Sequence, residues 1–216
     1  MKKWPVTIKE AKAVQRALRN KVKIKKLNKK INRVGACDVG FKDGDCIAAI
    51  CVFSYPDLRF LEEKTLRRKV DFPYIPGFLS FREGPALEKL FYQLKLKPDV
   101  LIFDGQGIAH PKQLGIASHV GAILNIPTIG CAKSRLWGDY KEPGVKRGDF
   151  SNLVDSNSGK LLGYVLRTRD NVKPVFISPG HLISAKEAKD IIISCAGQFR
   201  LPEPIRYAHR LSIKAK

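Results

Sequence analysis

The chain lacks paired cysteine motifs and long apolar segments. Its five cysteines are odd in number and include no Cys-x-x-Cys pair, so we expect buried free thiols in a reducing compartment, not disulfides or a zinc site. No apolar run follows Lys2 and Lys3, and no long uncharged apolar stretch occurs elsewhere. We therefore expect neither secretion nor a membrane-spanning helix, and a cytoplasmic location.

Two nucleotide-binding motifs are also missing. Gly105 and Gly107 begin a dinucleotide-type Gly-x-Gly-x-x-Gly pattern, but His110 stands where the third glycine is needed. The sequence also lacks the P-loop motif, a glycine-rich segment that ends in Gly-Lys-Ser/Thr. Internal repeats, low-complexity tracts and linkers are absent as well, so we expect one domain over residues 1–216.

Acidic residues are scarce, with 20 Asp and Glu against 40 Lys and Arg and a formal charge of +20. Such an excess favours a polyanionic partner. A membrane surface would call for the charge on one amphipathic helix, whereas here it runs the whole length, so nucleic acid is favoured. Charge alone leaves open a basic protein with no such partner.

Periodicity and turn signals predict an α/β fold, with a mixed central β-sheet flanked by helices. Capping boxes begin helices at Thr7 and Ser184, and Asp-Gly within residues 42–45 predicts a hairpin. The predicted helices are 7–26, 83–96, 116–124, 184–195 and a last one from 203. The predicted strands are 33–42, 46–54, 59–70, 99–103, 127–132, 160–168 and 173–178.

Three carboxylates stand out against this basic background. Asp38 is the lone charge in an otherwise apolar strand, and Asp104 ends another apolar strand. If the two strands are neighbours, the aspartates could meet and bind Mg²⁺ or Mn²⁺ through oxygen. Glu83 is predicted to open a helix after a stiff loop. Ordinary turn or cap aspartates, and a glutamate that complements the helix dipole, are the alternatives.

Three other side chains could carry chemistry. Tyr74 lies on a proline-stiffened loop and could insert between bases, although the residues alone favour packing beside its phenylalanine neighbours. Lys133 follows a buried strand and could neutralise charge on a cleaved phosphate. His209, on the last helix, could ligate a metal or orient a water. A solvated lysine and an ordinary helix histidine are the alternatives.

Longer runs of sequence resemble one family over nearly the whole chain. They are Pro73-Tyr-Ile-Pro-Gly77, Phe81-Arg-Glu-Gly-Pro85, Asp104-Gly-Gln-Gly-Ile-Ala-His-Pro111, Gly115-Ile-Ala-Ser-His119, Ile126-Pro-Thr-Ile-Gly130, Ala132-Lys-Ser134, Pro202-Glu-Pro204 and Ala208-His209. Together they resemble endonuclease V, the deoxyinosine 3′ endonuclease that acts on deaminated adenine. The resemblance implies a ribonuclease H-like fold.

The resemblance also implies roles for the candidate residues. Asp38, Glu83 and Asp104 would be the acidic metal-binding set, with His209 contributing, and Lys133 would lie near the scissile phosphate. Tyr74 would be the wedge. The residues that would surround the hypoxanthine are Leu79, Gly105, Gly115, Ala132, Ser134 and Leu136, with further substrate contacts from Pro73, Ile75, Pro76 and His110.

The implied reaction is Mg²⁺-dependent, with Mn²⁺ as a substitute. It cuts the second phosphodiester bond 3′ to the lesion and leaves 3′-hydroxyl and 5′-phosphate ends. The implied partner is DNA that contains deoxyinosine, or RNA that contains inosine. The protein is expected to be a monomer that does not bind membranes. The basic first helix and residues 64–69 would grip the flanking backbone. The rivals are a catalytically silent nucleic-acid-binding protein and a ribonuclease H-like nuclease that reads nucleic-acid structure.

Overall fold

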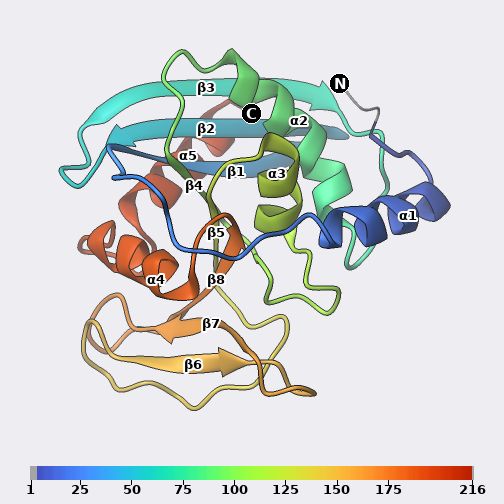
Figure 1. The fold of residues 1–216 in the computed structure, drawn as a ribbon. Helices are drawn as coiled ribbons and strands as arrows, with labels where there is room; N and C mark the ends of the chain where they lie inside the picture. The colour runs from blue at the N-terminus through green and yellow to red at the C-terminus, as the bar shows by residue number, and fades with distance from the viewer. Residues whose placement is uncertain (1–3, 216) are drawn as a thin grey trace.

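The strands of the chain build one mixed sheet with helices on both faces (Figure 1). The computed structural model describes residues 4–215, so Lys2 and Lys3 lie outside this range. The helices are α1 Ile8–Arg19, α2 Leu79–Gln93, α3 Ile116–Leu124, α4 Ala185–Ser194 and α5 Glu203–Lys214. The strands are β1 Arg33–Lys42, β2 Asp45–Ser54, β3 Phe60–Lys69, β4 Val100–Phe103, β5 Thr128–Ala132, β6 Phe150–Val154, β7 Leu161–Leu166 and β8 Val175–His181.

The strand order across the sheet is β3-β2-β1-β4-β5-β8-β7-β6. The pairs β1–β4 and β4–β5 are parallel, and the other pairs are antiparallel, which confirms a mixed sheet. The predicted hairpin joins β1 to β2, with Asp43 and Gly44 both at positive φ, as a two-residue hairpin turn requires.

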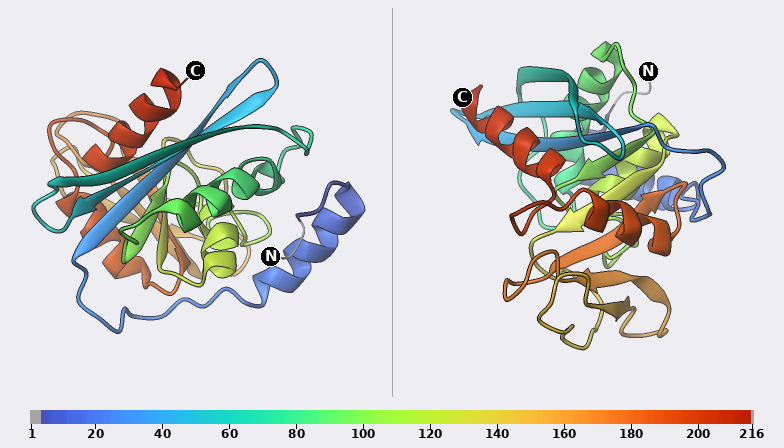
Figure 2. Two further views of the ribbon diagram at one scale, coloured as in Figure 1. Left: turned by 90° about the horizontal axis from the view of Figure 1, so that it is seen from above. Right: turned by 90° about the vertical axis from the view of Figure 1, so that its left-hand side faces the viewer.

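Each face of the sheet has its own apolar core, because alternate residues of a strand point to opposite faces. On β4, Val100 and Ile102 join the core beneath α4 and α5. Leu101 and Phe103 join the core beneath α2 and α3. Figure 2 shows α5 and α2 on opposite sides of β1 and β2. The centre of the sheet is therefore buried on both faces, and its strand ends are left to build a site.

The first helix is shorter than predicted, because α1 ends at Arg19 and not at residue 26. The next residues alternate lysines with apolar residues such as Val22, a two-residue period typical of extended chain. The N–H of Lys23 donates to Nδ1 of His181 at 3.2 Å, and its carbonyl accepts from the N–H of Leu182 at 2.6 Å. These backbone bonds replace the helical ones.

The second helix begins at Leu79, earlier than the predicted start at residue 83, and contains Pro85. An aromatic cluster explains the early start, since the Phe72 ring lies 6.2 Å from Phe78 and 5.5 Å from Phe81. Burying these rings pulls the end of the predicted loop into helix. The short strand β6 was not predicted at all, whereas the other strand bounds lie close to the predicted ones.

Two further expectations concern cysteines and membranes. All five cysteines are free and buried, as predicted. Among residues 4–215, no helix has the length and apolar character needed to cross a bilayer.

Candidate active site

The sheet register brings the two candidate aspartates side by side. In the parallel β1–β4 pair, Cys37 is the register partner of Phe103, and each of them is followed directly by an aspartate. Neighbouring strands lie about 4.8 Å apart, so Asp38 and Asp104 emerge next to each other at the carboxyl end of β4. These two residues are far apart in the chain but adjacent in the structure, as predicted.

The third carboxylate reaches the same place from a helix. Asp38, Glu83 and Asp104 all line one cavity of about 220 Å³, whose remaining wall is largely apolar. Glu83 lies on the second turn of α2, because this helix already begins at Leu79. It therefore does not open the helix as predicted, and the helix-dipole interpretation loses its basis, since that effect is confined to the first turn.

The environment of Glu83 is unusual for a glutamate in a basic protein. Burial, followed by the charges of Asp38 and Asp104, raises the pKa of Glu83 to about 8 from its ordinary value of 4.5. A carboxyl group with a pKa this high carries a proton at neutral pH unless a cation joins the cluster. The site is thus short of positive charge, even though the chain as a whole has an excess.

Protein donors already engage the two aspartates. Oδ2 of Asp38 accepts a 2.6 Å hydrogen bond from the hydroxyl of Ser212, and Nδ1 of His209 lies 3.1 Å from the same oxygen. The ammonium of Lys133 lies 2.5 Å from Oδ2 of Asp104. The structure therefore brings together all five residues assigned to catalysis, and it adds Ser212, which the sequence had not singled out.

The donor set fits a hard divalent cation, since carboxylate oxygens are the ligands that Mg²⁺ and Mn²⁺ prefer. The raised pKa of Glu83 is the structural sign that such a charge would be stabilised here. Within residues 4–215, no three His, Cys, Asp or Glu side chains are arranged to hold an ion as they now stand. Lys133 occupies one of the oxygens that a cation would use.

The proline loop presents its tyrosine to solvent. Tyr74 is 71% exposed, so its packing on the core, which the residues alone had favoured, is wrong. The neighbouring residues Phe72, Phe78 and Phe81 pack against one another in an aromatic cluster. Ile75, on the loop, packs against that cluster. Pro73 and Pro76 flank the exposed ring on both sides and are themselves exposed. The ring is therefore free to contact a partner.

Five of the six residues assigned to the base pocket lie in the loop after β4, at the start of α3, or at and after the end of β5, whereas Leu79 begins α2. A Cβ on Gly115 would lie 2.3 Å from the carbonyl oxygen of Gln106, so the loop after β4 and the start of α3 can approach only because this residue is glycine. The amide of Gln106 donates to the carbonyl of Ser134 at 3.0 Å and joins this loop to the one after β5. Leu79 and Leu136 are 39% and 54% exposed.

Gln106 is a residue that the sequence analysis overlooked within the Asp104-Gly-Gln-Gly107 run. A carbonyl can only accept, so the amide nitrogen of Gln106 must face Ser134 and its Oε1 must point elsewhere. That buried Oε1 has no hydrogen-bond partner among the described residues. The only early signal was a polar residue between two glycines after an apolar strand.

Burial lowers the pKa of the three histidines that do not contact the carboxylates, which are His110, His119 and His181. His110 is buried, and its Nδ1 accepts the N–H of Lys112 at 3.1 Å. Burial, helped by the charge of Lys112, lowers the pKa of His110 to about 4. His119 is buried against Trp4, and Nδ1 of His181 accepts a backbone N–H. Of these three, only His110 was assigned to the substrate.

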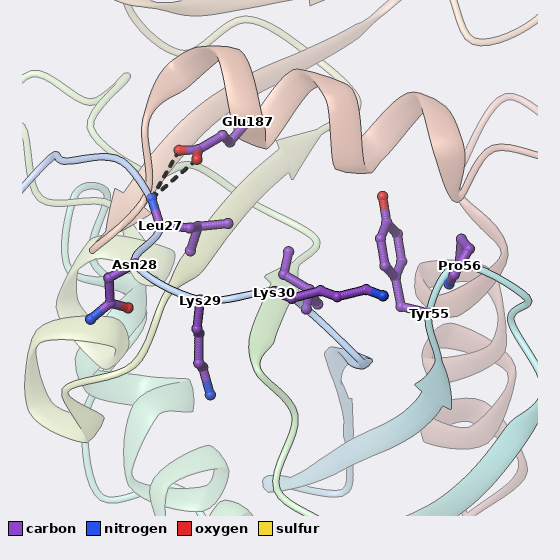
Figure 3. Close-up of a pocket in the computed structure, with 8 residues that line it drawn as sticks. Leu27, Asn28, Lys29, Lys30, Tyr55, Pro56 and Glu187 are labelled. Carbon is purple, nitrogen blue, oxygen red and sulfur yellow. Dashed lines mark hydrogen bonds between the residues drawn. The ribbon is translucent and has the colours of Figure 1, made fainter.

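Another hollow lies where the segment between α1 and β1 meets α4 (Figure 3). Its polar groups hold the chain in place, since Glu187 accepts the N–H of Leu27 at 3.1 Å and Lys29 pairs with Asp99 at 2.6 Å. Asp99 precedes β4 and Asp104 follows it, so this hollow lies at the opposite end of the strand from the carboxylate cavity. We assign it no chemistry.

Comparisons with known proteins identify the family of this chain. The endonuclease V family model matches residues 16–210. Endonuclease V of Methanothrix thermoacetophila is 46% identical over 211 residues, which cover 98% of this chain and 93% of that protein. Endonuclease V of Streptomyces avermitilis has a crystal structure that superposes with a TM-score of 0.92 at 36% identity, covering 98% of this chain and 94% of its own.

The fold and the carboxylate cavity thus define a nuclease of ribonuclease H-like fold. One further structure is informative about partners. Endonuclease V of Ciona intestinalis was crystallised with a 24mer DNA containing an inosine followed by a ribo-adenosine, and it has a TM-score of 0.85 and 30% identity over 96% of this chain and 97% of its own. The chain belongs to the endonuclease V family.

Proposed function

We propose that this chain is a metal-dependent endonuclease of DNA repair that recognises hypoxanthine, the base left when adenine is deaminated. It hydrolyses the second phosphodiester bond on the 3′ side of the lesion and leaves 3′-hydroxyl and 5′-phosphate ends. The convergence of Asp38, Glu83 and Asp104 on one cavity carries the proposal. We propose that the chain acts as a monomer.

In this proposal Asp38, Glu83 and Asp104 hold Mg²⁺ or, as a substitute, Mn²⁺, with His209 contributing. When bound, the ion supplies Lewis-acid polarisation of the phosphodiester and a lowered pKa for the attacking water. A bound cation would lower the pKa of Glu83, because its positive charge would offset the burial and the two aspartate charges that raise this pKa. Ser212 keeps the carboxylate of Asp38 in one orientation.

Lys133 has the second chemical role. Its side chain is 45% exposed, so its ammonium can leave Asp104 and meet the negative charge that develops on the cleaved phosphate. A flexible lysine suits this exchange because its charge is a mobile point at the end of a long stem.

Recognition of the lesion is proposed for the exposed ring of Tyr74 and the close-packed loops around Gly105 and Gly115. A flipped base needs a slot with close backbone approach, and an aromatic ring can fill the gap that it leaves. Support comes from the 71% exposure of Tyr74 and from the inosine-containing DNA bound to the Ciona intestinalis relative.

The test is cleavage of matched inosine and adenine oligonucleotides, as single- and double-stranded DNA and RNA, in Mg²⁺, with the cut mapped. We expect cutting of the inosine strands alone, at the second bond 3′ to the lesion. Asp38→Asn and Asp104→Asn should abolish cutting while DNA binding remains. The matched control is Asp190→Asn, which removes an exposed carboxylate from a surface ion pair.

Four results would count against the proposal. Equal cutting of inosine and adenine strands would mean that the enzyme reads structure and not the lesion. Normal cutting by Asp38→Asn would remove the site assignment. Turnover in Ca²⁺ as fast as in Mg²⁺ would contradict the hard-cation chemistry, because Ca²⁺ is expected to support binding alone. Cutting confined to RNA would move the substrate from DNA to RNA.

A further inference from the structure

A basic hollow of about 740 Å³ lies between α1 and the proline loop, and we name it the α1 groove. Lys12, Arg16 and Arg19 line it from α1, and Lys112 lines it from the opposite wall. The three α1 residues recur at helical spacing, so they share one face of the helix. Four cations from two separate segments thus converge on one space.

These cations are available to a ligand. Lys12, Arg16, Arg19 and Lys112 are exposed, and none of them forms an ion pair with any residue in the range 4–215. No acidic side chain lines the groove. A solvated basic face would look similar in charge, but it would not close around a hollow shared with two other loops.

The groove is connected to the proposed active site by short chain segments. Lys133 touches Asp104, whereas Leu136 lines the groove, and three extended residues span at most about 11 Å. The loop that starts at Asp104 likewise reaches the groove at His110. At 3.4 Å per nucleotide of duplex, the groove lies within a few nucleotides of the carboxylate cavity.

The groove also shares a wall with the proposed wedge. The side-chain amide of Gln15 donates to the carbonyl of Gly77 at 2.9 Å, and Gln15 is buried. Gly77 ends the proline loop that carries Tyr74, and its φ of 82° needs glycine. Any ligand that holds α1 therefore also holds the base of the loop.

We propose that the α1 groove binds the backbone phosphates of the substrate strand on the 5′ side of the hypoxanthine. This inference rests on the proposed function, in which the cut lies 3′ of the lesion. The carboxylate cavity takes the 3′ side and shares no lining residue with the groove, whereas Leu136, which is assigned to the base, also lines the groove, so the groove lies next to the base on its other side in this proposal. Its apolar floor, which includes Phe78 and Pro111, suits sugars, while its cations meet phosphates.

The test measures affinity for single-stranded inosine DNA in Ca²⁺, with a constant 3′ flank and a 5′ flank trimmed stepwise to one nucleotide. The wild-type protein should lose affinity as the 5′ flank is removed. Arg16→Ala/Arg19→Ala should bind the full strand about tenfold more weakly, with a shallower salt dependence. Its affinity should also respond less to 5′ trimming than that of the wild type, because two of the four cations of the groove are gone.

The matched control is Lys160→Ala/Lys173→Ala, which removes the same charge from exposed lysines outside the groove and should behave as the wild type. The proposal is overturned if the α1 variant keeps the wild-type response to 5′ trimming. It is also overturned if the variant binds the full single strand as tightly as the wild type and is weaker only in a parallel titration with the duplex, which would assign the groove to the complementary strand. A wild-type protein that ignores inosine but responds to 5′ length would refute the proposed function alone.

Discussion

The ammonium of Lys133 lies 2.5 Å from Oδ2 of Asp104, so the cation assigned to the phosphate is held by a carboxylate assigned to the metal. The two cations compete for one oxygen. Lys133→Met should therefore tighten Mn²⁺ binding several-fold while cleavage falls by about a hundredfold or more. Calorimetric titration of Mn²⁺ and single-turnover cleavage check the two halves. Lys160→Met, at an exposed lysine between β6 and β7, is the control. Weaker Mn²⁺ binding in Lys133→Met would contradict the competition.

Ser212 is predicted to act through Asp38. Its fully buried hydroxyl donates a 2.6 Å hydrogen bond to Asp38, and groups that orient a metal ligand typically matter by 10–100-fold in affinity or activity. Ser212→Ala should lower Mg²⁺ affinity and activity by about this factor. Ser212→Thr keeps a hydroxyl and should recover part of the loss. An alanine variant that is destabilised but binds Mg²⁺ normally would show that the role is structural only.

Glu83 should make the stability of the metal-free protein depend on pH. Burial and the charges of Asp38 and Asp104 raise the pKa of Glu83 to about 8, so the folded protein holds a proton that the unfolded chain releases above its ordinary 4.5. The proton on Glu83 therefore contributes to the stability of the folded protein. This contribution is fully present below the ordinary pKa of 4.5 and is lost as the pH rises through about 8.

Glu83→Gln removes the titrating group. Between about pH 5 and about pH 9, the free energy of unfolding should therefore fall less in this variant than in the wild type. Each pKa unit is worth about 1.4 kcal/mol, and partial solvation reduces the total, so we expect a difference of about 2 kcal/mol or more. Urea unfolding in EDTA measures it. Parallel pH profiles for the two proteins would mean that Glu83 titrates normally.

Tyr74 should affect recognition without affecting folding. Its ring is 71% exposed, so Tyr74→Ala should change the free energy of unfolding by less than about 0.5 kcal/mol. A lost stacking contact is worth about 1–3 kcal/mol, so the preference for inosine over adenine should fall roughly tenfold or more. Competition cleavage measures this preference. Tyr92→Ala, at a tyrosine that is 57% exposed on α2, is the control; an intact preference in Tyr74→Ala would remove the wedge role.

Local chemistry made much of the fold predictable. Several elements are specified by neighbouring residues alone. They are the hairpin at the Asp43-Gly44 turn, the helices that begin at the capping boxes of Thr7 and Ser184, and the apolar strand β4. The end of α1 was missed because a lysine-rich stretch continues the composition of the helix while its apolar period changes. Strand β6 was missed because its few apolar residues give no clear alternation.

Most of the candidate site residues were visible in the sequence, whereas their geometry was not. Asp38 and Asp104 were conspicuous as charges in apolar strands, yet only the β1–β4 register makes them neighbours. Tyr74 was misjudged from the residues alone, because its phenylalanine neighbours suggested a shared core that in fact closes without it. Ser212 could not be identified from the sequence, because the role of a serine on a helix depends on the residue that it contacts, here Asp38 on β1.

The two donors that contact Asp38 come from α5, 171 and 174 residues later in the chain. A ribosome must therefore complete almost the entire protein before this aspartate gains its partners. A growing or prematurely terminated chain already contains Asp38, Glu83 and Asp104 but has nothing to orient the first of them. Synthesis from one end to the other thus delays the assembly of the proposed nuclease site until the final helix has emerged.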